Sequence, residues 1–252
     1  LVSFALLGTE PPVVSRLQPS VEAVEERALT DATAGRVLLH DQFDREERDD
    51  SKEQVGGGWR TNSKSRAKGN KQVDLVERGD GGALHIVMHK EADHGVSVRH
   101  DVDAWTNGTL TLQFKLPPKG DIGIDLADLQ EKSVHAGHLL IVRVKPTVTE
   151  LRDHKAGGME LARRNRRKAG TVTEDDKRVM KATVKRIKRT VAVNEWHTLS
   201  MTTKDDVLSV QIDGESVGEL KSPGIAHPTK RTIRIAVNSE CWVDDLKLVA
   251  VE

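Results

Sequence analysis

The stretch Gly108-Thr-Leu-Thr-Leu-Gln-Phe-Lys-Leu116 decides the fold class. Leu110, Leu112 and Phe114 alternate with polar residues, which is the period-2 pattern of a strand with one buried face and one wet face. Similar short runs, separated by Gly, Asp, Asn and Pro, lie at 83–89, 95–100, 139–145, 196–202, 207–212, 232–237 and 242–251. This spacing predicts an all-β protein, an antiparallel β-sandwich.

Two local signals refine the strand assignment. Asp213-Gly214 separates the runs 207–212 and 215–220, and the pair suits a type I′ turn, which needs a positive φ at both central residues. The two runs are therefore expected to be antiparallel neighbours. In the stretch 121–128, the alternation places Asp121 and Asp125 on one face of a strand and apolar residues on the other.

The composition argues against several functions. The 252 residues carry 39 basic and 39 acidic side chains, so no overall charge draws the molecule to nucleic acid or to an anionic membrane. Cys241 is the only cysteine, which rules out a disulfide within the chain. No apolar run reaches the roughly 20 residues of a membrane span, and no Walker, Rossmann or zinc-finger spacing occurs.

Residues 1–36 are expected to form an N-terminal segment ahead of a sandwich made by residues 37–252. The segment begins Leu-Val-Ser-Phe-Ala-Leu-Leu-Gly, which resembles the end of the apolar region of a signal peptide. A frayed end or a first strand explains these residues equally well. On the signal-peptide interpretation, the segment is a remnant and a tether, and the protein is secreted or periplasmic.

A basic segment at about 153–190 interrupts the β pattern. Thr173 and the acidic residues after it form a capping box, and apolar residues then recur at helical spacing through Ile187, which predicts a helical insertion. Residues 152–189 include fourteen Lys or Arg against five Asp or Glu. A solvated surface or an anionic polysaccharide or envelope polymer suits this charge better than nucleic acid, because no aromatic residue is interleaved for base stacking.

Four stretches, at 38–44, 194–200, 207–214 and 242–248, resemble the concanavalin A-like jelly rolls. They look most like the bacterial 3-keto-disaccharide hydrolase-like group and its planctomycete-type relatives. The resemblance implies an exported carbohydrate-active protein that hydrolyses 3-keto-glycosides. A non-catalytic module that binds a glycan or an envelope polymer, and a structural interaction domain, stay open. The Glu-x-Asp-x-x-Glu pattern of retaining glucanases is missing, so their two-carboxylate chemistry is not expected.

Candidate catalytic residues follow from the chemistry of a 3-keto sugar, whose ketone acidifies the proton at C2. His135 and His138 stand three residues apart at the start of an apolar run and are candidates to remove that proton. Asp128 would orient a histidine, and Lys230 would hold the enolate oxygen. The alternative is that these side chains make only surface ion pairs or hydrogen bonds with loop carbonyls.

Five further residues are candidates for substrate binding, namely His94, Arg99, His227, Trp59 and Trp105. The histidines stand in loop sequences, the arginine can pair with a carboxylate or with vicinal hydroxyls, and the tryptophans can stack on sugar rings. Packing in the core is the alternative for these two tryptophans. Trp196 and Trp242 are assigned to the core outright.

The jelly-roll resemblance also implies a structural cation site, since the first and last strands lie together in such folds. Asp41, Asp44, Asp244 and Asp245 would supply oxygen ligands suited to Ca²⁺. A hydrogen-bond network is the alternative use of these carboxylates. A divalent metal held by the histidines at 135–138 is a further option, although their spacing fixes no third ligand.

Overall fold

The computed structural model describes residues 35–45, 53 and 55–251. The N-terminal segment predicted for residues 1–36 lies almost entirely outside these described residues, so its signal-peptide interpretation stays a prediction. None of the helices in the described part of the chain is long and apolar enough to cross a membrane.

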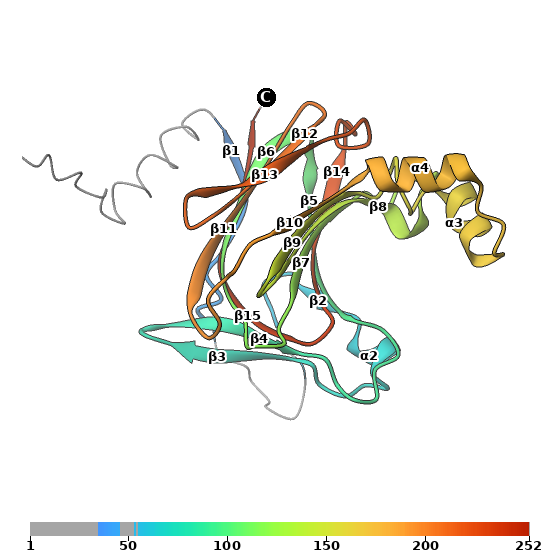
Figure 1. Cartoon of the computed structure of the whole chain (residues 1–252). Coiled ribbons are helices and arrows are strands. Elements are labelled where there is room, and N and C mark those ends of the chain that lie inside the picture. Colours follow the sequence, from blue (N-terminus) through green and yellow to red (C-terminus); the bar gives the residue numbers. More distant parts are fainter. Residues whose placement is uncertain (1–34, 46–52, 54, 252) are drawn as a thin grey trace, which may run out of the picture. The chain divides into compact units, whose positions relative to one another are not determined.

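Two antiparallel sheets face each other across one core (Figure 1). Sheet A consists, in spatial order, of β13 (Glu215–Lys221), β12 (Val207–Ile212), β11 (Trp196–Lys204), β6 (Asn107–Lys115), β15 (Glu240–Val251), β4 (Gly81–Val87) and β3 (Val73–Arg78), with β1 (Arg36–Asp41) paired to β15. Sheet B consists of β10 (Val184–Lys188), β9 (Val148–Asp153), β8 (His138–Lys145), β7 (Ile122–Ala127), β14 (Lys230–Val237), β5 (Val96–Trp105) and β2 (Arg60–Thr61). The predicted antiparallel β-sandwich is confirmed.

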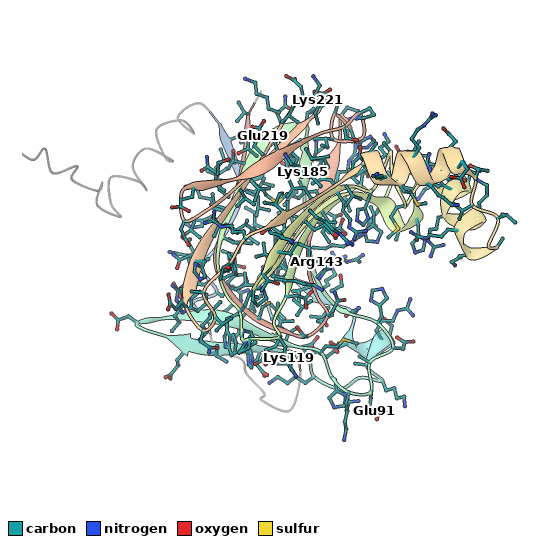
Figure 2. All side chains as sticks on the ribbon, in the orientation of Figure 1. Glu91, Lys119, Arg143, Lys185, Glu219 and Lys221 are labelled. Atoms are coloured by element: carbon teal, nitrogen blue, oxygen red, sulfur yellow. The ribbon has the colours of Figure 1, made fainter. Side chains whose placement is uncertain are left out.

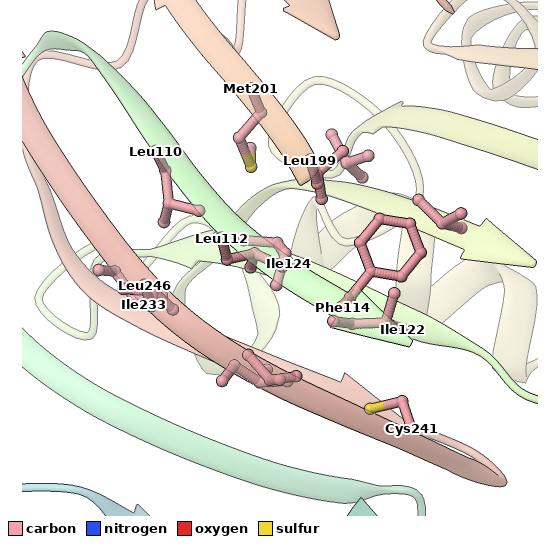
Figure 3. Packing of buried hydrophobic residues seen from close by; sticks show 14 of the residues in the cluster. Leu110, Leu112, Phe114, Ile122, Ile124, Leu199, Met201, Ile233, Cys241 and Leu246 are labelled. Carbon is pink, nitrogen blue, oxygen red and sulfur yellow. The ribbon is translucent and has the colours of Figure 1, made fainter. Parts of the chain in front are cut away.

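The core forms where β6 of sheet A meets β7 of sheet B. Leu112 and Phe114 of β6 pack with Ile122 and Ile124 of β7, and all four side chains are buried (Figure 3). Burial of each such side chain stabilises the fold by about 1.5–3 kcal/mol. Because side chains alternate along a strand, the isoleucines of β7 turn Asp125 toward the opposite face, called here the outer face of sheet B.

The turn between β12 and β13 follows the sequence prediction. Asp213 has φ of 54° and Gly214 has φ of 74°, the positive values that a type I′ turn needs. The two strands pair antiparallel from Val207 opposite Lys221 to Ile212 opposite Glu215. The predicted hairpin is confirmed.

The helical insertion is shorter than predicted. It contains α3 (Leu161–Lys168) and α4 (Glu174–Ala182), and the capping box of Thr173 and Asp176 is present at the start of α4. The expected continuation of the helix to Ile187 is wrong, because Val184–Lys188 forms β10 and pairs with β9. The described residues also contain α2 (Ser63–Arg66) and the 3-10 helix η1 (His135–Gly137).

The assignment of Trp196 and Trp242 to the core is also wrong. Both rings are only partly buried and lie on the outer face of sheet A, where Lys115 stands between them in the register of β11, β6 and β15. The Lys115 ammonium lies 4.3 Å from the ring centroid of Trp242, which also stacks on His85. Cations over the aromatic faces let these rings remain outside the core.

Candidate functional site

A row of polar side chains crosses the outer face of sheet B. The strand register sets Arg60 opposite Arg99, Arg99 opposite Arg234, and Arg234 opposite Asp125. Residues paired in register point to the same face, so four neighbouring strands (β2, β5, β14 and β7) bring three guanidinium groups and one carboxylate together. The candidate site is built around this row of charged side chains.

Asp125 is the buried anion of this row, with 1% of its surface exposed. Its Oδ2 lies 2.6 Å from Nδ1 of His138 and accepts a hydrogen bond of 3.0 Å from Nη1 of Arg234. Burial by itself raises the pKa of Asp125, but the charges of His138 and Arg234 and the His138 hydrogen bond outweigh it and hold the pKa below its usual value. Asp125 is therefore ionised.

The ionised carboxylate fixes the tautomer of His138. Nδ1 of His138 lies 2.6 Å from the acceptor Oδ2 of Asp125 and 3.1 Å from the donor Nη1 of Arg234. The shorter contact is with the ionised carboxylate, so the proton of a neutral His138 sits on Nδ1 and is donated to Asp125. Nε2 of His138 then carries a free lone pair. This is the arrangement of an oriented histidine base with a carboxylate behind it.

An irregular loop holds the histidines above the sheet. Ala136 and Gly137 both adopt a positive φ, of 51° and 70°, and Arg234 donates through Nη2 to the carbonyl of Ala136 at 2.7 Å. A Cβ on Gly137 would lie 2.2 Å from the carbonyl oxygen of Asp128, so only glycine fits this turn. Arg234 thus donates hydrogen bonds both to the loop, at Ala136, and to the carboxylate of Asp125.

His154 extends the pair of histidines to a cluster of three. Its ring centroid lies 5.6 Å from that of His138, which in turn lies 6.2 Å from that of His135. Neither ring nitrogen of His154 has a hydrogen-bond partner within the described part of the chain. Burial lowers the pKa of His154 to about 4 despite the opposing charge of Asp125, so the ring is neutral at physiological pH.

The pKa of His135 is also lowered. Burial is the main cause, followed by the charges of Arg164, His138 and Lys168, of which Arg164 and Lys168 belong to α3. At neutral pH the ring is a proton acceptor rather than an acid. The neighbouring helix thus adjusts the protonation of the cluster without a direct hydrogen bond.

A hollow of about 430 Å³ opens beside the cluster, over β8, β9 and β10. Its polar lining consists of Arg143, Lys145, Glu150, Arg152, His154 and Arg186, and Ile141 and Val148 supply its apolar part. Figure 2 labels Arg143 on this side of the molecule. These residues are called the cationic hollow below.

The predicted catalytic residue Asp128 belongs to a second cluster. It is buried, accepts a hydrogen bond of 2.6 Å from Thr229 and forms an ion pair with Arg231. The predicted binding residue His227 lies beside it, and Nδ1 of His227 is 2.6 Å from Nζ of Lys155. The structure therefore brings these two residues together, but it gives His138 the carboxylate of Asp125 instead of Asp128.

Lys230 is buried in the same region. Its ammonium donates to the carbonyl oxygens of Thr106 at 2.5 Å and His227 at 3.1 Å and lies 5.2 Å from the ring centroid of Trp105. Burial lowers the pKa of Lys230 to about 8. These contacts direct the ammonium to loop carbonyls, which corrects the expectation that it holds an enolate oxygen.

The other predicted binding residues are dispersed. Arg99 lies in the polar row, whereas His94 is exposed and its Nδ1 contacts the carbonyl oxygen of Gly95 at 2.8 Å. Trp105 and Trp59 are 5% and 7% exposed. Their burial corrects the expectation of sugar stacking, because neither ring presents a face to solvent.

The predicted cation ligands are each engaged by a protein donor. Asp41 pairs with Arg45, Asp244 pairs with Arg78, and His40 pairs with Asp245. Asp44 accepts from the backbone N–H of Gly82 at 2.8 Å. Separate donors occupy the four carboxylates, which corrects the prediction of a shared calcium site.

The metal option for the histidines has no support in the geometry either. Within residues 35–45, 53 and 55–251, no group of three or more His, Cys, Asp or Glu side chains is placed to hold a metal ion.

Three residues of the site were missed as candidates from the sequence. Asp125 was placed on the correct face but given no role, and Arg234 and His154 were not considered. Arg234 interrupts the apolar run Ile233–Ile235, as Asp125 interrupts the run of β7, and charged residues at such positions are a signal for a functional face. His154 carries no comparable signal, because its neighbours in space are distant in sequence.

A family model described as the 3-keto-alpha-glucoside-1,2-lyase-like domain matches residues 50–248 of the chain. No curated protein matches the chain. Among 287 matching solved chains, one is titled a sialidase, of which this chain spans 19%.

Two solved glucanases match over nearly their full length. A non-specific endo-beta-1,3(4)-glucanase of family GH16 is 14% identical, over 86% of this chain and 92% of its own, with a TM-score of 0.51. The beta-glucanase of Bacillus licheniformis is 8% identical, over 85% of this chain and 98% of its own, with a TM-score of 0.52. At these identities the similarity confirms the jelly-roll fold and nothing finer.

Proposed function

The chain belongs to the 3-keto-alpha-glucoside-1,2-lyase-like domain family, and from this we propose that it cleaves the glycosidic bond of a sugar that carries a ketone at C3. The proposed active site is the histidine cluster on the outer face of sheet B. The observation that carries the proposal is the 2.6 Å contact between Asp125 and His138, which supplies an oriented base. A retaining glucanase would need a pair of carboxylates across the bond, whereas a base suffices for an elimination.

The reaction begins with proton transfer from C2. Nε2 of His138 takes the C2 proton, and the electron pair of the C–H bond forms a C2=C3 double bond while the ketone becomes an enolate oxygen. When the ketone re-forms, a C1=C2 double bond forms and the bond between C1 and the leaving oxygen breaks. The leaving oxygen takes the proton back from His138. Water then adds across the C1=C2 double bond, its hydroxyl to C1 and a proton to C2, which completes hydrolysis.

Asp125 stabilises the imidazolium form of His138 between these two proton transfers. A carboxylate 2.6 Å from Nδ1 favours the positive charge that His138 gains when it removes the C2 proton. Arg234 holds Asp125 in place through its 3.0 Å hydrogen bond. Arg234 is thus a positioning residue in this scheme.

Arg99 is the proposed partner of the enolate oxygen. It stands next to Arg234 in the register of β5 and β14, and its side chain has no hydrogen-bond or ion-pair partner among the described residues. A guanidinium with unused donors can stabilise a developing oxyanion. Arg99 takes the role that the sequence analysis assigned to Lys230.

Release of p-nitrophenol from p-nitrophenyl 3-keto-α-glucoside tests the proposal. The wild-type protein is expected to release it, and His138→Ala is expected to lose about 100-fold or more of the rate. His40→Ala is the matched control, because His40 is an exposed histidine on β1 of sheet A. The proposal is overturned if the wild type is inactive, or if His138→Ala and His40→Ala behave alike. Binding of the glycoside without release would instead favour a glycan-binding module.

A further inference from the structure

The cationic hollow holds more positive charge than its carboxylate neutralises. Glu150 is the carboxylate of its lining, and Glu150 forms ion pairs with both Arg152 and Arg186. Arg143 pairs with Asp121 outside the lining. Lys145 has no carboxylate partner among the described residues. The hollow therefore retains a net positive charge when it is empty.

The shape of the sheet keeps these charges in the hollow. A Cβ on Gly123 would lie 2.9 Å from Nη2 of Arg143, so the missing side chain leaves room for the guanidinium beside the strand. Arg143, Glu150 and Arg186 are consecutive partners in the register of β8, β9 and β10. Three adjacent strands thus hold the charged groups on one face.

The hollow adjoins the proposed active site through His154. This histidine lines the hollow, and its ring centroid lies 5.6 Å from that of His138. Its two ring nitrogens are buried and have no partner in the described part of the chain, which leaves hydrogen-bonding capacity for a ligand. A group bound in the hollow would therefore lie next to the reacting sugar.

The positive charge continues beyond the hollow toward α3. A smaller hollow of about 80 Å³ shares Arg152 and His154 with the first and adds Arg167 and Asp153. The carboxylate of Asp153 accepts hydrogen bonds from Ser222 and from the backbone N–H of Gly224. Arg164 and Lys168 of α3 lie close enough to His135 to lower its pKa. A ligand that extends from the hollow toward α3 would meet these further cations.

We propose that the cationic hollow binds a carboxylate or sulfate group of the glycan that is cleaved at His138. The substrate is thus an acidic glycan, and its charged sugar lies over β8–β10. Guanidinium groups match both anions through paired N–H donors. The volume of about 430 Å³ falls in the usual range of about 300–1,000 Å³ for ligand sites. The claim that the acidic glycan is cleaved rests on the proposed function. The claim that the hollow binds its acidic group does not depend on that function.

Calorimetric titration of the His138→Ala protein tests binding without turnover. The probes are tetragalacturonate, a κ-carrageenan tetrasaccharide that carries sulfate alone, and neutral cellotetraose. At least one acidic probe is expected to bind tenfold more tightly than cellotetraose at low salt, with the preference shrinking as salt rises because ion pairs are screened. The two acidic probes distinguish carboxylate from sulfate recognition. Equal affinity for all three probes overturns the inference.

A charge-reversal variant tests whether the acidic group of the probe binds in the cationic hollow. In the same His138→Ala background, Lys145→Glu is expected to weaken binding of the acidic probe by about fivefold or more. Lys221→Glu is the matched control, because Lys221 is an exposed lysine of sheet A (Figure 2). Equal loss in both variants would show attraction to overall charge and overturn the assignment to the hollow.

The cleavage assay and the binding assay distinguish failure of the proposed function from failure of the inferred binding site. If the wild type releases no product from a 3-keto glycoside while the acidic preference persists, the proposed function fails and the binding site stands. If cleavage depends on His138 while acidic and neutral probes bind equally, the inferred binding site fails and the proposed function stands.

Discussion

Nδ1 of His138 lies 2.6 Å from Oδ2 of Asp125, a carboxylate buried on the next strand. A histidine three residues after His135 is thereby given one tautomer and one orientation. Asp125 lies on a face that the strand alternation determines, and the contact spans 13 positions in the sequence. Removal of the negative charge without change of shape is the most direct test of its role.

Asp125→Asn is expected to lower the cleavage rate by about 100-fold or more while the protein remains folded. The amide can donate to Nδ1 and so stabilises the wrong tautomer of His138, with the proton on Nε2. The rate should be measured with p-nitrophenyl 3-keto-α-glucoside, and folding by circular dichroism. A folded Asp125→Asn protein with the wild-type rate would exclude His138 as the oriented base.

Gly137→Ala is expected to destabilise the fold and reduce cleavage, since its Cβ would lie 2.2 Å from the carbonyl oxygen of Asp128. Gly170→Ala is a matched control, because both glycines have φ of 70° and Gly170 has open space around it. The backbone strain is shared, so Gly137→Ala should cost about 1–3 kcal/mol more in free energy of unfolding. Equal losses in urea denaturation would contradict the close approach.

The wild-type protein is expected to lose stability as the pH falls from 6.5 to about 4, because burial lowers the pKa of His154 from 6.5 to about 4. In this window the unfolded chain binds a proton at His154 and the folded chain does not, so acid favours unfolding. The contribution is on the order of 3 kcal/mol.

His154→Leu should remove this part of the pH dependence of the free energy of unfolding. His94→Leu, which removes an exposed histidine, should retain it. Urea denaturation at pH 7 and pH 4.5 measures the difference. Parallel curves for the wild type and His154→Leu would show that the ring titrates normally.

Lys230→Met is expected to lower stability and leave the cleavage rate of the folded molecules unchanged. The variant removes both hydrogen bonds to the carbonyl oxygens of Thr106 and His227, and an unsatisfied buried polar group costs about 1–3 kcal/mol. Thermal denaturation and the rate per folded molecule should be measured together. A large loss of rate in a stable protein would return Lys230 to the active site.

Much of the fold could be predicted because its signals are local. The alternation around Phe114 and the turn at Asp213-Gly214 depend on adjacent residues and on backbone sterics. Val184–Lys188 could not be placed this way, since its apolar residues fit both a continued helix and a strand. Pairing with the free edge of β9 decides between them, and that partner lies about 35 positions away.

The site could be predicted only in part, because most of its contacts join residues that are distant in the sequence. His135 and His138 share a short loop, so their proximity follows from the sequence. Asp128 was chosen over Asp125 as the partner, but Asp128 follows the end of β7 and accepts from Thr229, about 100 positions away. Arg234 and His154 reach the cluster only through the register of sheet B, which no local pattern specifies.

The short strand β10 ends sheet B and places Lys185, Arg186 and Lys188 along an otherwise open edge. A strand edge invites pairing with another molecule, and like charges on two approaching copies oppose it. Arg186, which also lines the cationic hollow, and its neighbours Lys185 and Lys188 would thus discourage fibril-like growth. Neutralising all three should promote self-association in concentrated solution, even where the isolated molecule keeps its fold.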